Sequence, residues 1–157
     1  MIRIFSTQNT FKFHYGVTLV ELLIVTAIIS ILATVAYPSY TYHVLKSHRA
    51  EAITTLTKTQ LHIESLYSTR TEFAAKDRYK ALLEIIINKK DGFCLIDTVC
   101  SIDNKRYHLS YELTGSGMDI YILSATPQND LGQNRDACGT LTLNAAGIGS
   151  GNESHCW

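Results

Sequence analysis

The chain has 157 residues, a length typical of one domain with an additional segment. Its 14 basic and 14 acidic side chains cancel, so no overall charge favours nucleic acid or an anionic membrane surface as a partner. Hydrophobic residues are concentrated between Val17 and Tyr37. The sequence beyond them, about 115 residues, is long enough to bury a modest core.

Residues 1–16 contain Arg3 and Lys12 but no acidic residue. By the positive-inside rule, this segment stays in the cytoplasm and the C-terminal part crosses the membrane. The apolar run that follows, about 21 residues, reaches about 31 Å as a helix, which is enough to span the hydrocarbon layer. A secretory signal peptide has a shorter apolar region of about 7–15 residues, followed by small residues. The run therefore predicts a membrane-spanning helix over residues 17–39.

Two residues of this segment do not fit a plain membrane anchor. The carboxylate of Glu21 lies near its start, and such a charge costs roughly 2.5–3.5 kcal/mol at the centre of a bilayer and less near the surface. Pro38 lacks a backbone N–H and crowds the carbonyl of Thr34, which predicts a kink or a melted turn between these residues. The plain alternative is a simple anchor that has an acid at the membrane surface and ends at the proline.

An amphipathic stretch follows from Tyr40 to about Ser68. Its apolar residues recur at helical spacing: they are Leu45, Ala52, Leu56, Ile63 and Tyr67. Most charged residues fall off this stripe, among them Arg49 and Glu64. We therefore expect one helix from Thr18 to Ser68, whose second half packs on a sheet.

The C-terminal part predicts one short helix and an antiparallel sheet. The helix is expected over residues 79–87, and strand patterns cover residues 106–113, 120–127 and 139–145. The glycines of the TGSGMD segment suit a hairpin turn between the first two strands. We expect three or four antiparallel strands on the second half of the long helix, which is an α+β fold.

All four cysteines lie beyond the apolar run: Cys94, Cys100, Cys138 and Cys156. An even number of cysteines after a membrane segment predicts disulfides in an oxidising compartment. The sequence allows three pairings, of which we favour 94–100 with 138–156 because each pair closes a local loop. No C-x-x-C pair is present, so the spacing does not indicate zinc, and we expect no metal.

Motifs of common enzyme classes are missing from the sequence. It has no H-E-x-x-H, P-loop, G-x-S-x-G or G-x-G-x-x-G pattern, and its six histidines are scattered. We expect a protein that is not an enzyme, has no catalytic residues and holds no cofactor. Small basic spots at Lys89 and Lys105 do not form a basic stripe, so direct nucleic-acid binding is not expected.

The segment GVTLVEL, residues 16–22, resembles the processing motif of type IV prepilins. In that family a peptidase cuts after a glycine that follows a short basic leader, and the fifth residue of the mature chain is a glutamate. The resemblance implies cleavage between Gly16 and Val17, N-methylation of Val17, and Glu21 as the fifth mature residue. Pro38 matches the proline that bends the helix in many of these proteins. Val17 stands where phenylalanine is usual, and Tyr15 stands where a basic residue is more common.

Two later segments extend the resemblance. HRAEAITTLTKTQLHIESLY is similar to the second half of the pilin helix, and DACGTLTLNAAG with the terminal CW is similar to the C-terminal region of PilE-type minor pilins. The resemblance implies the type IV pilin fold, a long N-terminal helix packed on a small antiparallel sheet with a disulfide-framed C-terminal loop. The implied parts are a leader over residues 1–16, a hydrophobic helix over 17–39 and a periplasmic or extracellular globular domain over 40–157.

By this resemblance the protein is a structural subunit, most like a minor pilin, of a type IV pilus that serves twitching motility, adhesion or DNA uptake. The implied partners are prepilin peptidase, other pilins in a homo- or hetero-oligomeric filament, and the inner-membrane assembly platform. The precursor would cross the bacterial inner membrane once, with its N-terminus in the cytoplasm, and the mature chain would enter the cell-surface pilus.

The resemblance also gives Glu21 a role in assembly. In the filament its carboxylate would meet the Val17 amine of a neighbouring subunit, and each charge would offset the desolvation of the other. The pair would set the register between subunits, and Pro38 would let the helix bend as they pack. A pseudopilin of a type II secretion system and a membrane-anchored periplasmic binding domain are the alternative interpretations.

Overall fold

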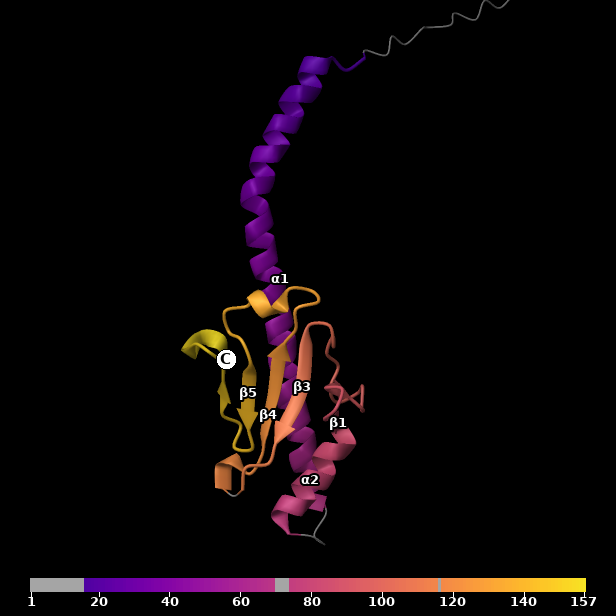
Figure 1. Cartoon of the computed structure of the whole chain (residues 1–157), viewed down its shortest axis with the longest axis vertical. Coiled ribbons are helices and arrows are strands. Elements are labelled where there is room, and N and C mark those ends of the chain that lie inside the picture. Colours follow the sequence, from indigo (N-terminus) through magenta and orange to yellow (C-terminus); the bar gives the residue numbers. More distant parts are fainter. Residues whose placement is uncertain (1–15, 70–73, 116) are drawn as a thin grey trace, which may run out of the picture. The chain divides into compact units, whose positions relative to one another are not determined.

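The computed structural model describes residues 16–69, 74–115 and 117–157. The chain divides into two compact units between Ser39 and Tyr40. Helix α1, Leu19–Thr69, has 51 residues and contributes to both units (Figure 1). Pro38 lies inside α1 and the helix is not interrupted there, so of the two expected outcomes the melted turn is wrong and the kink stays a prediction. A proline removes one backbone hydrogen bond, and intact turns on both sides can keep the helix formed.

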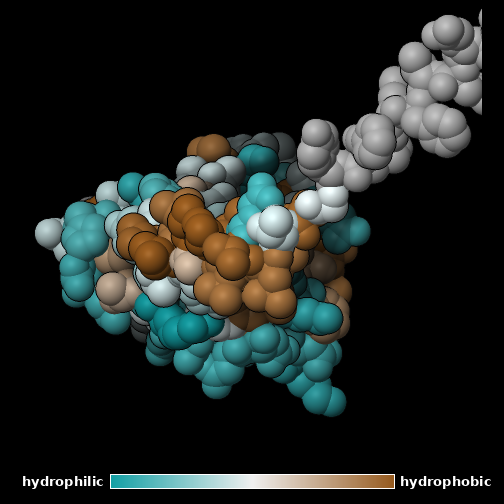
Figure 2. Space-filling model, turned by 90° about the horizontal axis from the view of Figure 1, so that it is seen from above, coloured by the Kyte–Doolittle hydropathy of each residue, from teal (hydrophilic) through white to brown (hydrophobic). Residues whose placement is uncertain are grey.

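The first unit consists of the apolar part of α1. Its large apolar side chains are exposed: Val17, Leu19, Val20, Leu22, Leu23, Ile24, Val25, Ile28, Ile29, Ile31, Leu32, Val35 and Tyr37. Figure 2 shows apolar atoms gathered around the N-terminal end of this helix. Within the described residues, α1 is the one helix that is long and apolar enough to cross a membrane. A helix that is apolar on all sides needs lipid or other helices around it.

The second unit contains a four-stranded antiparallel sheet against which the rest of α1 packs. Its strands follow the order β3 (Tyr107–Glu112), β4 (Ile122–Pro127), β5 (Leu141–Asn144) and β6 (Gly149–Ser150). Every second residue of β3 is buried, as expected for a strand with one face on a core. The apolar stripe of α1 supplies three buried residues to this core: Ala52, Leu56 and Ile63. The expected pilin fold is thereby confirmed.

A short helix and a small second sheet connect α1 to β3. Helix α2, Ala75–Ile86, begins four residues before the expected start at Tyr79. The added turn is polar and shows no apolar periodicity, but its alanine and lysine favour a helix and Asp77 suits a helix N-terminus. Strands β1 (Ile87–Asn88) and β2 (Phe93–Cys94) then pair antiparallel, although Ile87 was expected to end the helix and β2 to lie in a loop.

In the described residues, the loops carry three short 3₁₀ helices and two disulfides. The 3₁₀ helices are η1 (Gly117–Asp119), η2 (Gln133–Arg135) and η3 (Ser154–Cys156). Cys94 pairs with Cys100, six residues along the chain, and Cys138 pairs with Cys156, eighteen residues along the chain. The structure therefore contains the two local pairs that the sequence favoured.

Candidate functional site

The residues of the processing motif lie at the start of α1. Gly16 and Val17 are exposed and precede the helix, so the bond between them lies in a segment without regular structure. The backbone N–H of Glu21 donates a hydrogen bond of 3.2 Å to the Thr18 hydroxyl, which caps the helix. Glu21 is in the first turn, where the helix dipole favours a negative charge. The bond predicted to be cut is thus exposed, and the predicted assembly carboxylate lies one turn beyond it.

A buried ion pair joins α1 to the C-terminal loop. The Arg49 guanidinium lies 2.9 Å from the Asp136 carboxylate, and it also contacts the Sγ of Cys138. The same carboxylate accepts a hydrogen bond of 3.1 Å from the backbone N–H of Cys138. The loop framed by the Cys138–Cys156 disulfide is therefore attached to α1 by a charged contact next to the disulfide.

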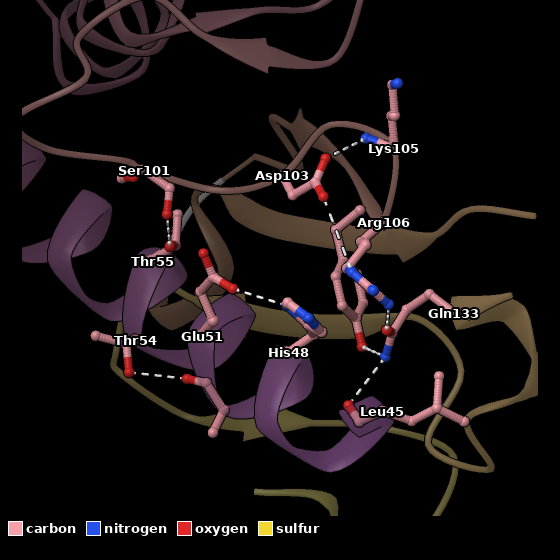
Figure 3. Close-up of polar contacts among 12 residues, drawn as sticks. Leu45, His48, Glu51, Thr54, Thr55, Ser101, Asp103, Lys105, Arg106 and Gln133 are labelled. Carbon is pink, nitrogen blue, oxygen red and sulfur yellow. Dashed lines mark hydrogen bonds and ion pairs between the residues drawn. The ribbon is translucent and has the colours of Figure 1, made fainter. Parts of the chain in front are cut away.

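Gln133 forms a second link beside this pair. It is fully buried, and its amide nitrogen donates to the carbonyl oxygen of Leu45 at 3.1 Å and to the hydroxyl of Tyr107 at 3.0 Å. Figure 3 shows the Arg106 side chain turned toward the Gln133 amide, to which it donates at 3.4 Å. Burial raises the pKa of Tyr107 to about 12, which keeps its phenol protonated. One glutamine thus connects η2, α1 and β3.

Glu64 connects α1 to α2 and to the sheet. Its carboxylate accepts hydrogen bonds from the hydroxyls of Tyr79, at 3.0 Å, and Tyr121, at 2.7 Å. Burial and the Glu64 carboxylate raise the pKa of both phenols above their usual range. Glu64 and Arg49 were assigned to the polar face of the helix, but the structure turns both inward.

The first basic spot of the sequence lies in the turn between β1 and β2. Lys89 and Lys90 are exposed there, and the Lys89 amine sits 5.2 Å from the centre of the Tyr111 ring. Gly92 ends the turn with a positive φ of 67°, and its carbonyl accepts a hydrogen bond of 2.7 Å from the N–H of Leu109 in β3. This bond holds the lysine-bearing turn against the outer edge of β3.

The second basic spot lies just before β3. The Asp103 carboxylate accepts a hydrogen bond of 2.9 Å from the backbone N–H of Lys105 and lies 3.9 Å from the Arg106 guanidinium. The Lys105 side chain points away from this carboxylate (Figure 3). Its amine therefore stays available to a ligand.

Comparison with known protein families identifies the chain. A family model described as type IV minor pilin ComP, DNA uptake sequence receptor, matches residues 38–142, about two thirds of the chain. The chain belongs to this family of type IV minor pilins. A second family model, the prokaryotic N-terminal methylation motif, matches residues 12–37. No solved structure matches the chain.

The two matches confirm the resemblance to minor pilins from both ends of the sequence. The apolar helix of this minor pilin fits anchoring in a membrane before assembly into a surface pilus. The family is one of structural pilins, which assemble with other pilins.

The fold of this minor pilin brings its two basic spots to one strand. Lys105 lies four residues before Leu109, which is bonded to the carbonyl of Gly92 at the end of the Lys89–Lys90 turn. Lys105 itself lies in the turn that leads into β3, so the two spots adjoin the same strand, one just before its start and one beside Leu109. Sequence analysis missed this group, since the spots are far apart in the chain and no helical or strand period connects them.

The residues at the C-terminal disulfide do not form a metal site. His155 lies within 4.8 Å of the sulfurs of Cys138 and Cys156. Those two sulfurs are bonded to each other, and zinc requires free thiolates. This group therefore serves to frame the C-terminal loop.

Proposed function

We propose that this minor pilin is a DNA receptor of the type IV pilus and serves DNA uptake. The observation that carries the proposal is the family match over residues 38–142, because that family is described as a DNA uptake sequence receptor. The proposal departs from the expectation against direct nucleic-acid binding, which rested on the zero net charge and on two small basic spots that form no basic stripe in the sequence. A protein without net charge can still have a local basic surface, because net charge does not report how the charges are distributed.

The basic sheet edge supports this role. We define it by Lys89, Lys90 and Lys105, all of which are exposed. Amines of this kind bind backbone phosphates, and such contacts position a protein on DNA and make its affinity fall with salt. Asp103, the nearest acid to Lys105 in sequence, is already engaged by backbone and arginine donors, which lowers its competition with phosphate.

The test is DNA binding by the full mature chain in detergent, measured by fluorescence anisotropy at several salt concentrations. The variant Lys89→Glu/Lys90→Glu should lose at least tenfold in affinity, and the slope of affinity against salt should become shallower by one to two phosphate contacts. Lys76→Glu/Lys80→Glu on α2 is the matched control, because it makes the same change of charge at two exposed lysines that are not part of the basic edge. Equal losses of DNA affinity in both variants would show that only net charge matters, and would refute the basic sheet edge as the DNA-binding surface.

We also infer the processing and assembly steps. Prepilin peptidase cuts between Gly16 and Val17, the new Val17 amine is methylated, and Glu21 pairs with this amine of a neighbouring subunit. The exposed bond before α1 and the methylation-motif match support this order. The inner-membrane platform then moves the subunit from a single-span membrane state into the filament, where Pro38 allows the helix to bend.

Mass spectrometry of sheared filaments tests these steps. A methylated peptide that begins at Val17 is the expected result. Glu21→Leu should still be cleaved but should be absent from filaments, while Glu21→Asp should retain part of its incorporation. Uncleaved protein that stays in the membrane would favour a membrane-anchored binding domain. Cleaved protein found with a secretion complex in place of pili would favour a pseudopilin.

A further inference from the structure

A small cavity of about 120 Å³ lies in the globular unit between α1, the η2 segment and the C-terminal end. It is lined by Tyr42, Leu45, Lys46, Arg49, Arg135, Asp136, Ala137 and His155. We propose that this cavity binds the phosphate of an anionic phospholipid headgroup while the protein is still held in the membrane. The proposal rests on the membrane-anchored precursor inferred above, but it does not depend on DNA binding.

The charges around the cavity favour an anion. Lys46 and Arg49 come from α1, and Arg135 comes from η2. Asp136 is the one acid in the lining, and its carboxylate is already bonded to Arg49 and to the backbone N–H of Cys138. The cavity therefore presents more positive charge than its own carboxylate neutralises, which suits a phosphate.

Two of the cationic side chains are unpaired. The amine of Lys46 and the guanidinium of Arg135 make no ion pair or side-chain hydrogen bond within the part of the chain that the structure describes. His155 adds a third group, although Glu153 lies 3.2 Å from its ring and both are more than half exposed, so this pair is weak. An anion entering the cavity would thus gain contacts without breaking a buried pair.

The Arg135 side chain lies over the turn at Gly132. Its guanidinium lies against Gly132, where an added Cβ would overlap one of its nitrogens. Gly132 has a positive φ of 71°, a conformation that favours glycine, so this close contact is built into the turn. The absence of a side chain at Gly132 thus leaves room for the guanidinium at the cavity wall.

The position of the cavity in the chain points to lipid. Tyr40 is bonded directly to Ser39, the last residue of the apolar unit, and Lys46 is six residues further, about 9 Å along α1. The headgroup layer of a bilayer is about 5–8 Å thick on each side, so these residues stay near it when the apolar helix spans the membrane. Three tyrosines around this point are more than half exposed, as is common for tyrosine at a membrane surface: Tyr37, Tyr40 and Tyr42.

The size of the cavity limits what enters it. A volume of about 120 Å³ corresponds to about four water molecules, enough for a phosphate but not for acyl chains. The headgroup phosphate would occupy the cavity while the chains stay in the bilayer. Basic pockets near the membrane surface are one known form of site for anionic lipid headgroups.

The experiment uses the full mature chain in nanodiscs and counts retained lipids by native mass spectrometry. Phosphatidylglycerol should be retained in preference to phosphatidylcholine, because only the former has a net negative headgroup. Lys46→Gln and Arg135→Gln should each weaken retention of phosphatidylglycerol about fivefold. Lys58→Gln, an exposed lysine of α1 outside the cavity lining, should leave retention unchanged.

Other outcomes would overturn the proposal. Equal retention of both lipids, or equal retention by all variants, would show that the cavity does not select an anionic headgroup.

Occupancy by inorganic phosphate at the same concentration as lipid would reduce the site to a free-anion site. Loss of DNA affinity in Lys46→Gln with unchanged lipid retention would assign the cavity to DNA. Loss of filament incorporation alone would assign it to an acidic side chain of a neighbouring subunit. The DNA-receptor proposal is tested by a different measurement, the DNA affinity of Lys89→Glu/Lys90→Glu. Its failure can therefore be told apart from failure of the lipid proposal.

Discussion

Arg49 on α1 and Asp136 in the C-terminal loop form an ion pair of 2.9 Å across 87 residues of sequence, with their side chains at most 10% exposed. Burying two charges costs free energy that their attraction only partly offsets, so such a pair adds little net stability. Its effect is on structure, because an arrangement that leaves either charge buried without its partner has a higher free energy. The pair therefore fixes where the C-terminal loop sits on the helix.

Arg49→Met should destabilise the globular unit by about 3–5 kcal/mol, because it leaves the Asp136 carboxylate buried without its partner. The free energy of unfolding can be followed by the fluorescence of Trp157, the single tryptophan. Lys46→Met removes a positive charge nearby that makes no ion pair, and it should cost less than about 0.5 kcal/mol. The double variant Arg49→Met/Asp136→Leu should recover most of the loss. If Arg49→Met were as stable as Lys46→Met, the structural role of the Arg49–Asp136 pair would be contradicted.

The two disulfides should differ in their contribution to stability. In the chain-entropy treatment, a bridge stabilises more when it closes a longer loop. The Cys138–Cys156 bridge spans 18 residues and the Cys94–Cys100 bridge spans 6. Replacing the first pair with serine should cost roughly 3 kcal/mol and replacing the second roughly 2 kcal/mol. Chemical denaturation of both double variants checks the order, and a larger loss from the shorter loop would contradict it.

Tyr107 should make the fold sensitive to alkaline pH. Burial raises its pKa to about 12, above the ordinary value near 10, because the charged phenolate is disfavoured inside the protein. Its contribution to stability is therefore complete below pH 10 and is lost as the pH rises from about 10 to 12.

Replacing Tyr107 with phenylalanine should flatten the fall in stability over this range, measured as unfolding free energy at successive pH values. At neutral pH the same variant should cost about 1 kcal/mol, since the amide of Gln133 loses an acceptor. Tyr42→Phe serves as the control, because Tyr42 is exposed and its change should leave the pH profile as it is. An unchanged profile for Tyr107→Phe would mean that another group causes the alkaline loss.

The fold follows closely from local patterns in the sequence. The helical stripe, the alternation in β3 and the local cysteine pairs each depend on neighbours in the chain. The small β1–β2 sheet was missed because strands of two residues show no period. The melted turn at Pro38 was wrong because a single missing hydrogen bond does not end a long helix.

The inward polar residues could not be read from the helix pattern. Glu64 was assigned to the solvent face because it is charged, yet its partner Tyr121 lies 57 residues further along the chain. Gln133 in a loop has no periodicity at all, but it is fully buried and bonded to the carbonyl of Leu45, 88 residues away. Contacts of this kind depend on the tertiary arrangement. The basic edge was missed for the same reason, since β3 joins two short basic segments that are separate in the sequence.

The last prediction tests how the Lys89–Lys90 turn is held at that edge. Gly92 has a φ of 67°, and an added Cβ would overlap the imidazole of His108, which covers it. Gly92→Ala should therefore cost about 1–2 kcal/mol for the left-handed backbone and displace His108 as well.

Gly147→Ala is the matched control, because Gly147 has a φ of 80° but an added Cβ there would meet its nearest atom, on Gln60, at 3.5 Å. Both variants place an alanine in the left-handed region, which costs free energy, and only Gly92→Ala should also move the Lys89–Lys90 turn. The measurements are unfolding free energy and DNA affinity of the mature chain. We expect the larger loss of stability in Gly92→Ala, which also displaces His108, and a loss of DNA affinity in this variant alone, because the Lys89–Lys90 turn moves relative to Lys105. Equal DNA affinity in the two variants would show that the geometry of this turn does not determine binding.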